Sequence, residues 1–599
     1  MLQMISIIPA LVTTMILSLA DAGVNDSDSK FDFIIVGGGS AGSVLANRLS
    51  EEMDWQILLI EAGGEPLPET EIPSNWHNMI KSSQDWGYRT QPDSRMFFGL
   101  ENKTNYWPRG KGLGGSSIIN AMLYQRGNDR DYNEWERAGN PGWGFKNILP
   151  YFLKSEDFQD ISRQDPAFHN TGGYLTVSPR LSPDEAVKVI ESAAKEMKIA
   201  TMFDVNRDQY IGFGPFDTTT RYGLRCSTSK AFLEPARLRK NLVIWKNVQV
   251  TKVLIDKKLK AYGVEYVDSQ GKVCHVNSTR EVLLSAGSVG SPQILMLSGI
   301  GIQKHLKEKN IPVLKDLPVG ANLQDHVCFP GVVFSANKDP AMTLQYQKYL
   351  QVAAWKGIST IEVAKVVGFI NTKNKSQYPN IEFLTIRIPM NAKKMNNDKS
   401  VIGSIFVFSD KVSKHHDYLN FNSDLLYMMP ILIKPKSRGK ILLRDNNYKT
   451  KPDIYPNYFS DVNGEDLDTM IEAIDFLIAM NDTDSFRKNN LTLERVDYPA
   501  CSKHNLTSLD YWECSLSQVA GTFWHPTGTC KMGPKDDPTS VVDPTLKVIG
   551  ITGLRVIDAS IMPTIVSAHT NAPSIMIGEK GADLIKLTHG KYIGPLLSY

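Results

Sequence analysis

The chain has 599 residues, of which 42% are hydrophobic, and a formal net charge of +2 at pH 7. A chain of this length can bury the cores of two packed domains, and a charge so close to zero gives no reason to expect a nucleic-acid partner. The six cysteines form no C-x-x-C pair, which argues against a structural zinc site or a thioredoxin-like motif. We therefore expect a small-molecule substrate.

The N-terminus has the pattern of a secretory signal. An apolar stretch from Ile5 to Leu19 is followed by small residues up to Ala22, so we expect a signal peptide over residues 1–22 and a secreted, extracellular protein. Because this segment has no Lys or Arg, an uncleaved anchor is the alternative. No later segment is expected to span a membrane. Sequons that fit a glycosylated surface begin at Asn25, Asn102, Asn277, Asn374, Asn481, Asn490 and Asn505.

Residues 31–61 have the order of a dinucleotide-binding unit: strand, glycine turn, helix, strand and acidic residue. Gly37 suits the tight turn, Gly39 the approach of backbone N–H groups to a pyrophosphate, and Gly42 the close packing of helix on strand. The helix expected near Ser40 presents its positive end to the phosphates, and Glu61 would accept the ribose hydroxyls. A merely structural glycine turn is the alternative. The cofactor-binding residues predicted here are Gly37, Gly39, Ser40, Ala41, Gly42 and Glu61.

Two more glycine-rich segments follow. Residues 108–117 read PRGKGLGGSS, which lacks the G-K-[S/T] ending of a P-loop and indicates a backbone pressed against a flat or anionic group. Residues 285–301 read SAGSVGSPQILMLSGIG after a strand-like run. We expect a helix to open near Ser291 and Pro292, with its N-terminus toward the crevice where a cofactor lies in an open α/β sheet.

The middle of the chain has a different pattern. Strand-like runs such as 402–408 and 429–433 are separated by Asn, Lys and Pro clusters. Cys501 and Cys514 lie in a turn-rich segment and are candidates for a disulfide if the protein is exported, although spacing alone does not fix connectivity.

Taken together, these segments resemble the glucose-methanol-choline (GMC) family of FAD-dependent oxidoreductases from Phe31 to about Lys586. The resemblance rests on GGGSAG with Glu61, on PRGKGLGGSS with Asn120 and Met122, on SAGSVGSPQILMLSGIG, and on the run from Trp524 to Lys580. The phrases HPTGTCKMG and NAPSIMIGEKGADLI look most like insect members, including those called glucose dehydrogenase with a quinone acceptor.

The resemblance implies an α/β fold with a Rossmann-like FAD-binding domain and a second, α+β substrate domain built on an antiparallel sheet. Residues 31–330 would be mainly FAD-binding, 331–516 mainly the substrate domain, and 517–588 a return to the FAD domain that carries the catalytic histidines. A helix N-terminus near Pro573 would stabilise negative charge on the reduced flavin. The further FAD-binding residues implied are Gly112, Gly115, Ser116, Asn120, Met122, Val248, Asp558, Asn571 and Pro573.

The same resemblance assigns the chemistry to two histidines. His525, in FWHPTGTCKMG, is the expected base that removes a hydroxyl proton, because its unperturbed pKa of about 6.5 leaves much of it neutral near pH 7. His569, in SAHTNAP, would orient the substrate oxygen. The other histidines are interpreted as structural, except that His326, after GANLQD, is a candidate to lie nearer the cofactor and is assigned no role. His525, Cys530 and His569 are not expected to bind a metal, because no acidic partner is in place.

The predicted function is hydride transfer from the CH–OH group of a sugar or small primary alcohol to FAD, with a quinone-like acceptor. An aryl or small-alcohol oxidase that uses dioxygen and releases hydrogen peroxide is the nearest alternative. A hydroxynitrile lyase with structural flavin, or a non-catalytic flavin-binding protein, remains open from other classes. The oligomeric state does not follow from the sequence.

Overall fold

The structure is a computed structural model that describes residues 30–179, 185–336, 366–373, 376–395 and 399–591. The predicted signal peptide and the sequons at Asn25 and Asn374 lie outside these residues. None of the helices in the described ranges combines the length and the apolar character that a membrane span requires.

The first sheet is built on strands that are buried on both faces. β1 (Phe31–Val36) reads FDFIIV and β2 (Ile57–Ile60) reads ILLI, and their side chains are almost all buried, as expected of a covered parallel sheet. The strand order is β12-β2-β1-β15-β14-β13, with β25 paired to β15. β1 runs parallel to β2 and to β15. The other strands are β12 (Leu242–Trp245), β13 (Gln249–Ile255), β14 (Ala261–Val267), β15 (Val273–Leu284) and β25 (Leu554–Val556).

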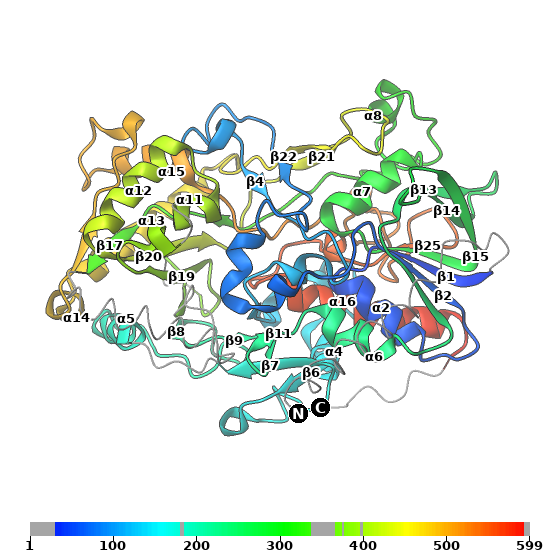
Figure 1. Ribbon diagram of the computed structural model, residues 1–599, viewed down its shortest axis with the longest axis horizontal. Coiled ribbons are helices and arrows are strands. Elements are labelled where there is room, and N and C mark those ends of the chain that lie inside the picture. Colours follow the sequence, from blue (N-terminus) through cyan, green and yellow to red (C-terminus); the bar gives the residue numbers. More distant parts are fainter. Residues whose placement is uncertain (1–29, 180–184, 337–365, 374–375, 396–398, 592–599) are drawn as a thin grey trace, which may run out of the picture.

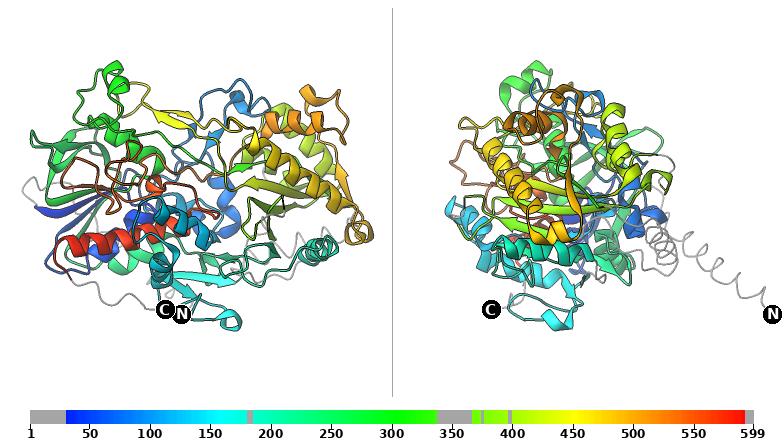
Figure 2. Two further views of the ribbon diagram at one scale, coloured as in Figure 1. Left: turned by 180° about the vertical axis from the view of Figure 1, so that it is seen from behind. Right: turned by 90° about the vertical axis from the view of Figure 1, so that its left-hand side faces the viewer.

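Helices from both ends of the chain cover this sheet. α2 (Ser40–Leu49) starts directly after the glycine turn, as predicted, and packs on α16 (Asn571–Thr588) near the C-terminus. The guanidinium of Arg48 on α2 donates two hydrogen bonds of 2.8 Å to the carboxylate of Glu579 on α16. Figures 1 and 2 show the blue α2 beside the red α16. The first and last parts of the chain therefore form one layer.

The helix predicted to open near Ser291 begins earlier. α7 spans Gly287–Leu297, so Pro292 lies inside it. A proline has no N–H for the carbonyl four residues before it, and the carbonyl oxygen of Ser288 instead accepts a hydrogen bond of 2.7 Å from the Thr529 hydroxyl. A side chain from a distant loop thus replaces the hydrogen bond that the proline removes.

The second sheet is antiparallel throughout its described pairings. Its order is β23-β17-β20-β19-β18-β8, and β16 joins β20 to β24. α13 (Glu465–Asn481) packs on β19 and β20, and α12 (Asp410–Asn422) packs on β20. This sheet lies at the opposite end of the long axis from the first (Figure 1). Its strands are β8 (Gly212–Gly214), β16 (Val327–Cys328), β17 (Val333–Ala336), β18 (Val367–Ile370), β19 (Ile381–Ile388), β20 (Asp424–Leu432), β23 (Leu491–Glu494) and β24 (Gly521–Thr522).

Two expectations for the middle of the chain have different outcomes. The run 429–433 lies largely in β20, but residues 402–408 are not a strand: α11 covers Val401–Phe406. The side chain of Ser400 caps this helix by accepting from the backbone N–H of Gly403, and Val407 ends it with a φ of 56°. A short apolar run does not distinguish a buried strand from a buried helix. Here the capping side chain of Ser400 favours the helix.

The candidate disulfide is present, because Cys501 and Cys514 are bonded to each other. The first of these residues lies in a short 3-10 turn, Pro499–Cys501, and the second lies in α15 (Leu509–Val519). The disulfide therefore ties α15 to the segment that follows β23.

Shorter elements connect the two sheets. The remaining helices are α3 (Asp129–Arg137), α4 (Phe145–Ser155), α5 (Glu185–Glu196), α6 (Glu234–Ala236), α8 (Gln303–Glu308), α10 (Ala392–Met395) and α14 (Asp484–Lys488). The remaining strands are β3 (Tyr88–Arg89), β4 (Tyr106–Trp107), β5 (Leu123–Tyr124), β6 (Glu156–Phe158), β7 (Leu175–Pro179), β9 (Asp217–Thr218), β10 (Thr220–Arg221), β11 (Leu224–Arg225), β21 (Lys440–Leu442) and β22 (Asp453–Tyr455).

Candidate active site

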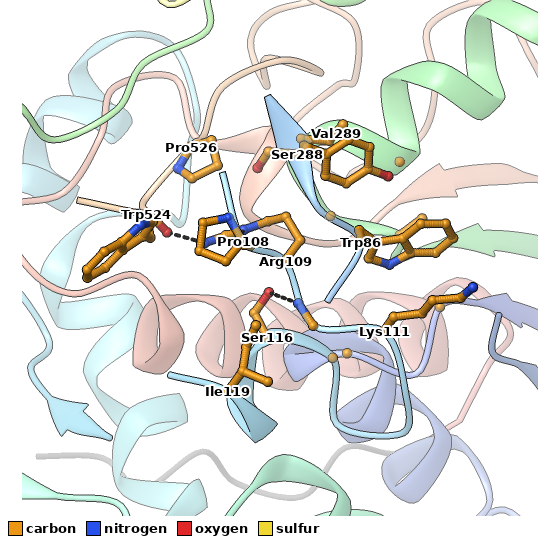
Figure 3. Close-up of a pocket in the computed structure, with 18 of the residues that line it drawn as sticks. Trp86, Pro108, Arg109, Lys111, Ser116, Ile119, Ser288, Val289, Trp524 and Pro526 are labelled. Carbon is orange, nitrogen blue, oxygen red and sulfur yellow. Dashed lines mark hydrogen bonds between the residues drawn. The ribbon is translucent and has the colours of Figure 1, made fainter. Parts of the chain in front are cut away.

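A cleft of about 560 Å³ runs from the glycine turn after β1 to the histidines near the C-terminus. Figure 3 shows one part of it, where Arg109 lies between Trp86 and Trp524 and donates a hydrogen bond to the carbonyl oxygen of Trp524. The backbone N–H of Gly110 donates a hydrogen bond of 3.2 Å to the Ser116 hydroxyl. The PRGKGLGGSS segment therefore forms one wall of the cleft.

The three glycines of the turn are required for different reasons. A Cβ on Gly37 would lie 2.5 Å from the carbonyl oxygen of Ser285, and one on Gly42 would lie 1.9 Å from that of Gly37. The backbone of Gly37 also has a φ of 100°, which favours glycine. A Cβ on Gly39 would instead meet only the Cα of Gly115, at 3.8 Å. Contacts with protein atoms explain why Gly37 and Gly42 must be glycine. The open space beside Gly39 fits a pyrophosphate.

Glu61 lies at the end of β2, with its carboxylate in the cleft. Its two oxygens accept hydrogen bonds from the backbone N–H groups of Gly38, at 2.9 Å, and Gly63, at 2.8 Å. Burial raises the pKa of this carboxyl group. Each oxygen keeps a further acceptor position, so the carboxylate can hold the two loops in place and still face a ribose.

Asn120 and Met122 lie directly after the second glycine segment. The side-chain oxygen of Asn120 accepts from the backbone N–H of Met122, at 3.1 Å, and from the guanidinium of Arg225, at 2.7 Å. Met122 is fully buried and has a φ of 62°, which is strained for a residue other than glycine. The strained backbone at the cleft wall is held by these polar contacts.

The N-terminal ends of α7 and α16 both face the cleft. Asp558, after β25, accepts from the backbone N–H of Gly287 at 2.9 Å and from the Ser291 hydroxyl at 2.5 Å. The Ser40 hydroxyl donates to the side-chain oxygen of Asn571 at 2.7 Å. The starts of α2, α7 and α16 thus converge, and the N–H groups at the start of α2 favour an anion there.

Most of the predicted cofactor-binding residues lie on the cleft surface. Three do not: Gly42 faces the turn, Gly112 packs against the loop after β2, and Pro573 lies within the first turn of α16. The predicted residues that line the cleft are Gly37, Gly39, Ser40, Ala41, Glu61, Gly115, Ser116, Asn120, Met122, Val248, Asp558 and Asn571, together with His525 and His569.

The two predicted catalytic histidines are neighbours. The ring centroids of His525 and His569 are 4.8 Å apart, with the ring planes at 79°. The backbone N–H of His525 donates to Asp325 at 2.8 Å. Burial, together with nearby His569 and Arg109, lowers the pKa of His525 well below its usual 6.5. The imidazole is therefore neutral at physiological pH and able to accept a proton.

Sequence reasoning missed two partners of these histidines. Nδ1 of His326 lies 2.9 Å from Nδ1 of His525. Oε1 of Glu382 lies 3.0 Å from Nε2 of His569, and the other carboxylate oxygen is buried without a hydrogen-bond partner. A signal for Glu382 was present in the sequence, because a single carboxylate interrupts the apolar strand IEFLTIRI.

The cleft wall opposite the glycine segments is apolar where the structure describes it. The second sheet and α11 contribute Leu384, Ile386, Phe406 and Met429 to the lining. The rings of Phe406 and Trp524 are stacked, with centroids 5.6 Å apart. These four side chains offer hydrophobic contact and no hydrogen bonds to a ligand.

Comparisons with known proteins agree with this site. Models of the GMC oxidoreductase family match residues 31–328 and 435–578. Glucose dehydrogenase [FAD, quinone] of Drosophila pseudoobscura pseudoobscura is 37% identical, over 94% of this chain and 88% of its own. Alcohol dehydrogenase [acceptor] of Pseudomonas putida is 37% identical, over 93% and 95%.

Among solved structures, the crystal structure of pyridoxine 4-oxidase from Mesorbium loti superposes with a TM-score of 0.78 at 27% identity, over 94% of this chain and all of the other. The chain therefore belongs to the GMC oxidoreductase family and is an FAD-dependent oxidoreductase that acts on the CH–OH group of alcohols or sugars.

Proposed function

We propose that this enzyme oxidises the CH–OH group of a primary alcohol or a sugar to a carbonyl, with His525 as the base and His569 as the residue that orients the substrate oxygen. The observation that carries the proposal is the pair of imidazoles, 4.8 Å apart, at the end of a cleft whose other end fits the pyrophosphate. Bound FAD supplies the acceptor for the hydride that leaves the carbinol carbon.

The protein side of the reaction is a proton transfer to the buried imidazole of His525. His525 takes the hydroxyl proton while the carbon–hydrogen bond breaks and the carbonyl forms, so one proton and one hydride leave the substrate. Burial keeps His525 neutral before the reaction. His569, held by Glu382, can hydrogen-bond the same oxygen and so fix the direction of the carbinol carbon.

The similar enzymes and the apolar wall of the cleft support different classes of substrate. The name of the Drosophila enzyme supports a sugar, and that of the Pseudomonas enzyme supports an alcohol. The apolar side chains of Leu384, Ile386, Phe406 and Met429 support an alcohol with a hydrophobic body, because sugar hydroxyls against them would lose their hydrogen bonds to water. Between the two, we favour the alcohol.

A quinone-like acceptor is proposed for reoxidation, on the strength of the similarity to glucose dehydrogenase [FAD, quinone]. The likeness to pyridoxine 4-oxidase supports a second candidate, an oxidase that uses dioxygen. We also propose that the protein is secreted and glycosylated. The disulfide supports export, and of the described sequons only Asn481 is half-buried, whereas Asn102, Asn277, Asn490 and Asn505 are exposed.

Anaerobic stopped-flow absorbance of the holoprotein tests the proposal. Loss of the oxidised-flavin absorbance with alcohols or sugars would support hydride transfer, and recovery with a quinone but not with air would support the dehydrogenase. Recovery in air would favour the oxidase. No loss of absorbance with either substrate class would contradict the redox function and favour a lyase or a binding protein.

A further inference from the structure

His326 is a fully buried imidazole with a close hydrogen-bond partner at each of its two ring nitrogens. Its Nε2 lies 3.0 Å from the carbonyl oxygen of Val566, and its Nδ1 lies 2.9 Å from Nδ1 of His525. The ring planes of the two histidines are at 85°. This contact joins the residue before β16 to the loop after β24.

The backbone holds the two histidines in register. The N–H of Phe523 donates to the carbonyl oxygen of His326 at 2.8 Å, and Gln324 and Thr527 exchange backbone hydrogen bonds of 3.1 and 2.8 Å. Between them, Asp325 accepts from the backbone of His525 and from the hydroxyl of Tyr458. The distance between the two Nδ1 atoms is therefore set by a paired backbone.

The partner of Nε2 decides which nitrogen of His326 carries the proton. A carbonyl oxygen only accepts hydrogen bonds, so Nε2 of His326 must donate to Val566. Burial, with His569 and Lys434 nearby, lowers the pKa of His326 to about 3, so the ring is neutral and carries a single N–H. Nδ1 of His326 is then a bare acceptor, and Nδ1 of His525 must be the donor.

We propose that His326 is a positioning residue that holds the proton of neutral His525 on Nδ1 and leaves Nε2 of His525 bare as the base. The tautomer follows from the two contacts of His326 and from its neutral state, whereas its catalytic consequence rests on the proposed function. A second consequence concerns the return of the proton. His326 cannot pass a proton onward, because its Nε2–H ends on a backbone carbonyl, so the proton gained at Nε2 of His525 leaves through the cleft.

The other ionisable groups near His326 and His525 also have defined positions. His569 faces His525 across the cleft with Glu382 behind it, Arg109 lies on the cleft side, Lys434 lies near His326, and Asp325 lies between the two backbones. Among these groups, only His326 makes a hydrogen bond with Nδ1 of His525 in the described part of the chain. The tautomer of His525 therefore depends on that contact.

Two variants separate positioning from packing. His326→Asn keeps an oxygen near the position of Nδ1 that can accept from His525, and His326→Leu removes the acceptor while filling the space. His416 provides the matched control, because it is also buried and hydrogen-bonds through Nδ1 to Tyr427, at 2.9 Å, but makes no hydrogen bond with His525 within the described residues. His416→Asn and His416→Leu measure the cost of disturbing a buried imidazole elsewhere.

Histidine-selective ¹⁵N NMR of the holoprotein reads the tautomer without turnover, with His525→Asn used to assign the signals. We expect a protonated Nδ1 and a bare Nε2 in the wild type and in His326→Asn, and a mixture of tautomers in His326→Leu. A protonated Nε2 in wild-type His525 would overturn the proposal. Because this readout needs no substrate, it stands even if alcohols fail to reduce the flavin.

Flavin reduction then tests the consequence. We expect His326→Leu to slow reduction by about 100-fold, and His326→Asn to stay within about tenfold of the wild type. The acid limb of the pH profile should move to lower pH in His326→Leu, because the imidazolium of His525 loses its acceptor. If His326→Asn and His326→Leu lose the same fraction of the reduction rate, and the acid limb of the pH profile does not move, His326 has only a packing role.

Discussion

Glu382 on β19 and His569 beside α16 are joined by a hydrogen bond of 3.0 Å between Oε1 and Nε2, although 187 positions separate them. The carboxylate is fully buried. This contact connects the antiparallel sheet to the histidine that faces the cofactor cleft, so it contributes to the alignment of the two halves of the active site.

Replacement of Glu382 should disturb the orientation of His569. Glu382→Leu removes the only acceptor that the Nε2–H of His569 has among the described residues, and we expect flavin reduction at saturating alcohol to slow by more than about tenfold. Glu382→Gln keeps an acceptor oxygen at nearly the same volume and should lose less. Stopped-flow reduction of both variants is the measurement, and equal rates in Leu and wild type would show that the contact does not matter for turnover.

His525→Ala should retain FAD but lose the base. We expect reduction to slow by roughly 100-fold or more, because general-base catalysis contributes about that much. His275→Ala is the control, since this histidine is exposed on β15 and does not line the cleft. Absorbance of the purified variants reports cofactor content, and normal reduction in His525→Ala would remove this residue from the mechanism.

Two glycine variants should fail in different ways. Gly39→Val places its side chain in the cleft, so we expect a folded protein without FAD. Gly42→Val places its Cβ within 1.9 Å of a backbone oxygen and should prevent normal folding. Flavin absorbance and circular dichroism distinguish the two results. A yellow, folded Gly39→Val protein would contradict the placement of the pyrophosphate.

Acid stability should depend on His416. Burial lowers the pKa of this residue to about 3 in the folded protein, whereas the unfolded chain binds the proton near 6.5. The contribution of neutral His416 to the free energy of unfolding is therefore complete above pH 6.5. It is lost as the pH falls toward 3, by about 1.4 kcal/mol per pH unit. In urea unfolding of His416→Asn, the free energy of unfolding should fall with decreasing pH less steeply than in the wild type, by that amount per pH unit.

The control for this slope is Tyr427→Phe. It removes the hydroxyl that contacts Nδ1 of His416 but leaves the imidazole in place. We expect a loss of about 1 kcal/mol at every pH, with the acid slope retained. Parallel slopes for His416→Asn and the wild type would mean that the buried imidazole does not control acid unfolding.

The parts of the site that could be predicted from sequence are those whose chemistry is local. Gly37, the start of α2 and the pairing of β1 with β2 follow from neighbouring residues. His326 and Glu382 could not be placed, because their partners lie 199 and 187 positions away and only the folded sheets bring them together. The error at 402–408 has a simpler cause, since an apolar run of that length fits either a strand or a helix.

The meeting of α2 and α16 has a consequence for biosynthesis. The glycine turn emerges early from the ribosome, but Asn571, which accepts from Ser40, follows about 500 residues later. At about 5–20 residues per second, translation needs roughly 25–100 s to cover that distance. During this time the apolar strands β1 and β2 lack α16 and β25, so the nascent chain must be protected from aggregation. The binding site for FAD is complete only when synthesis is nearly finished.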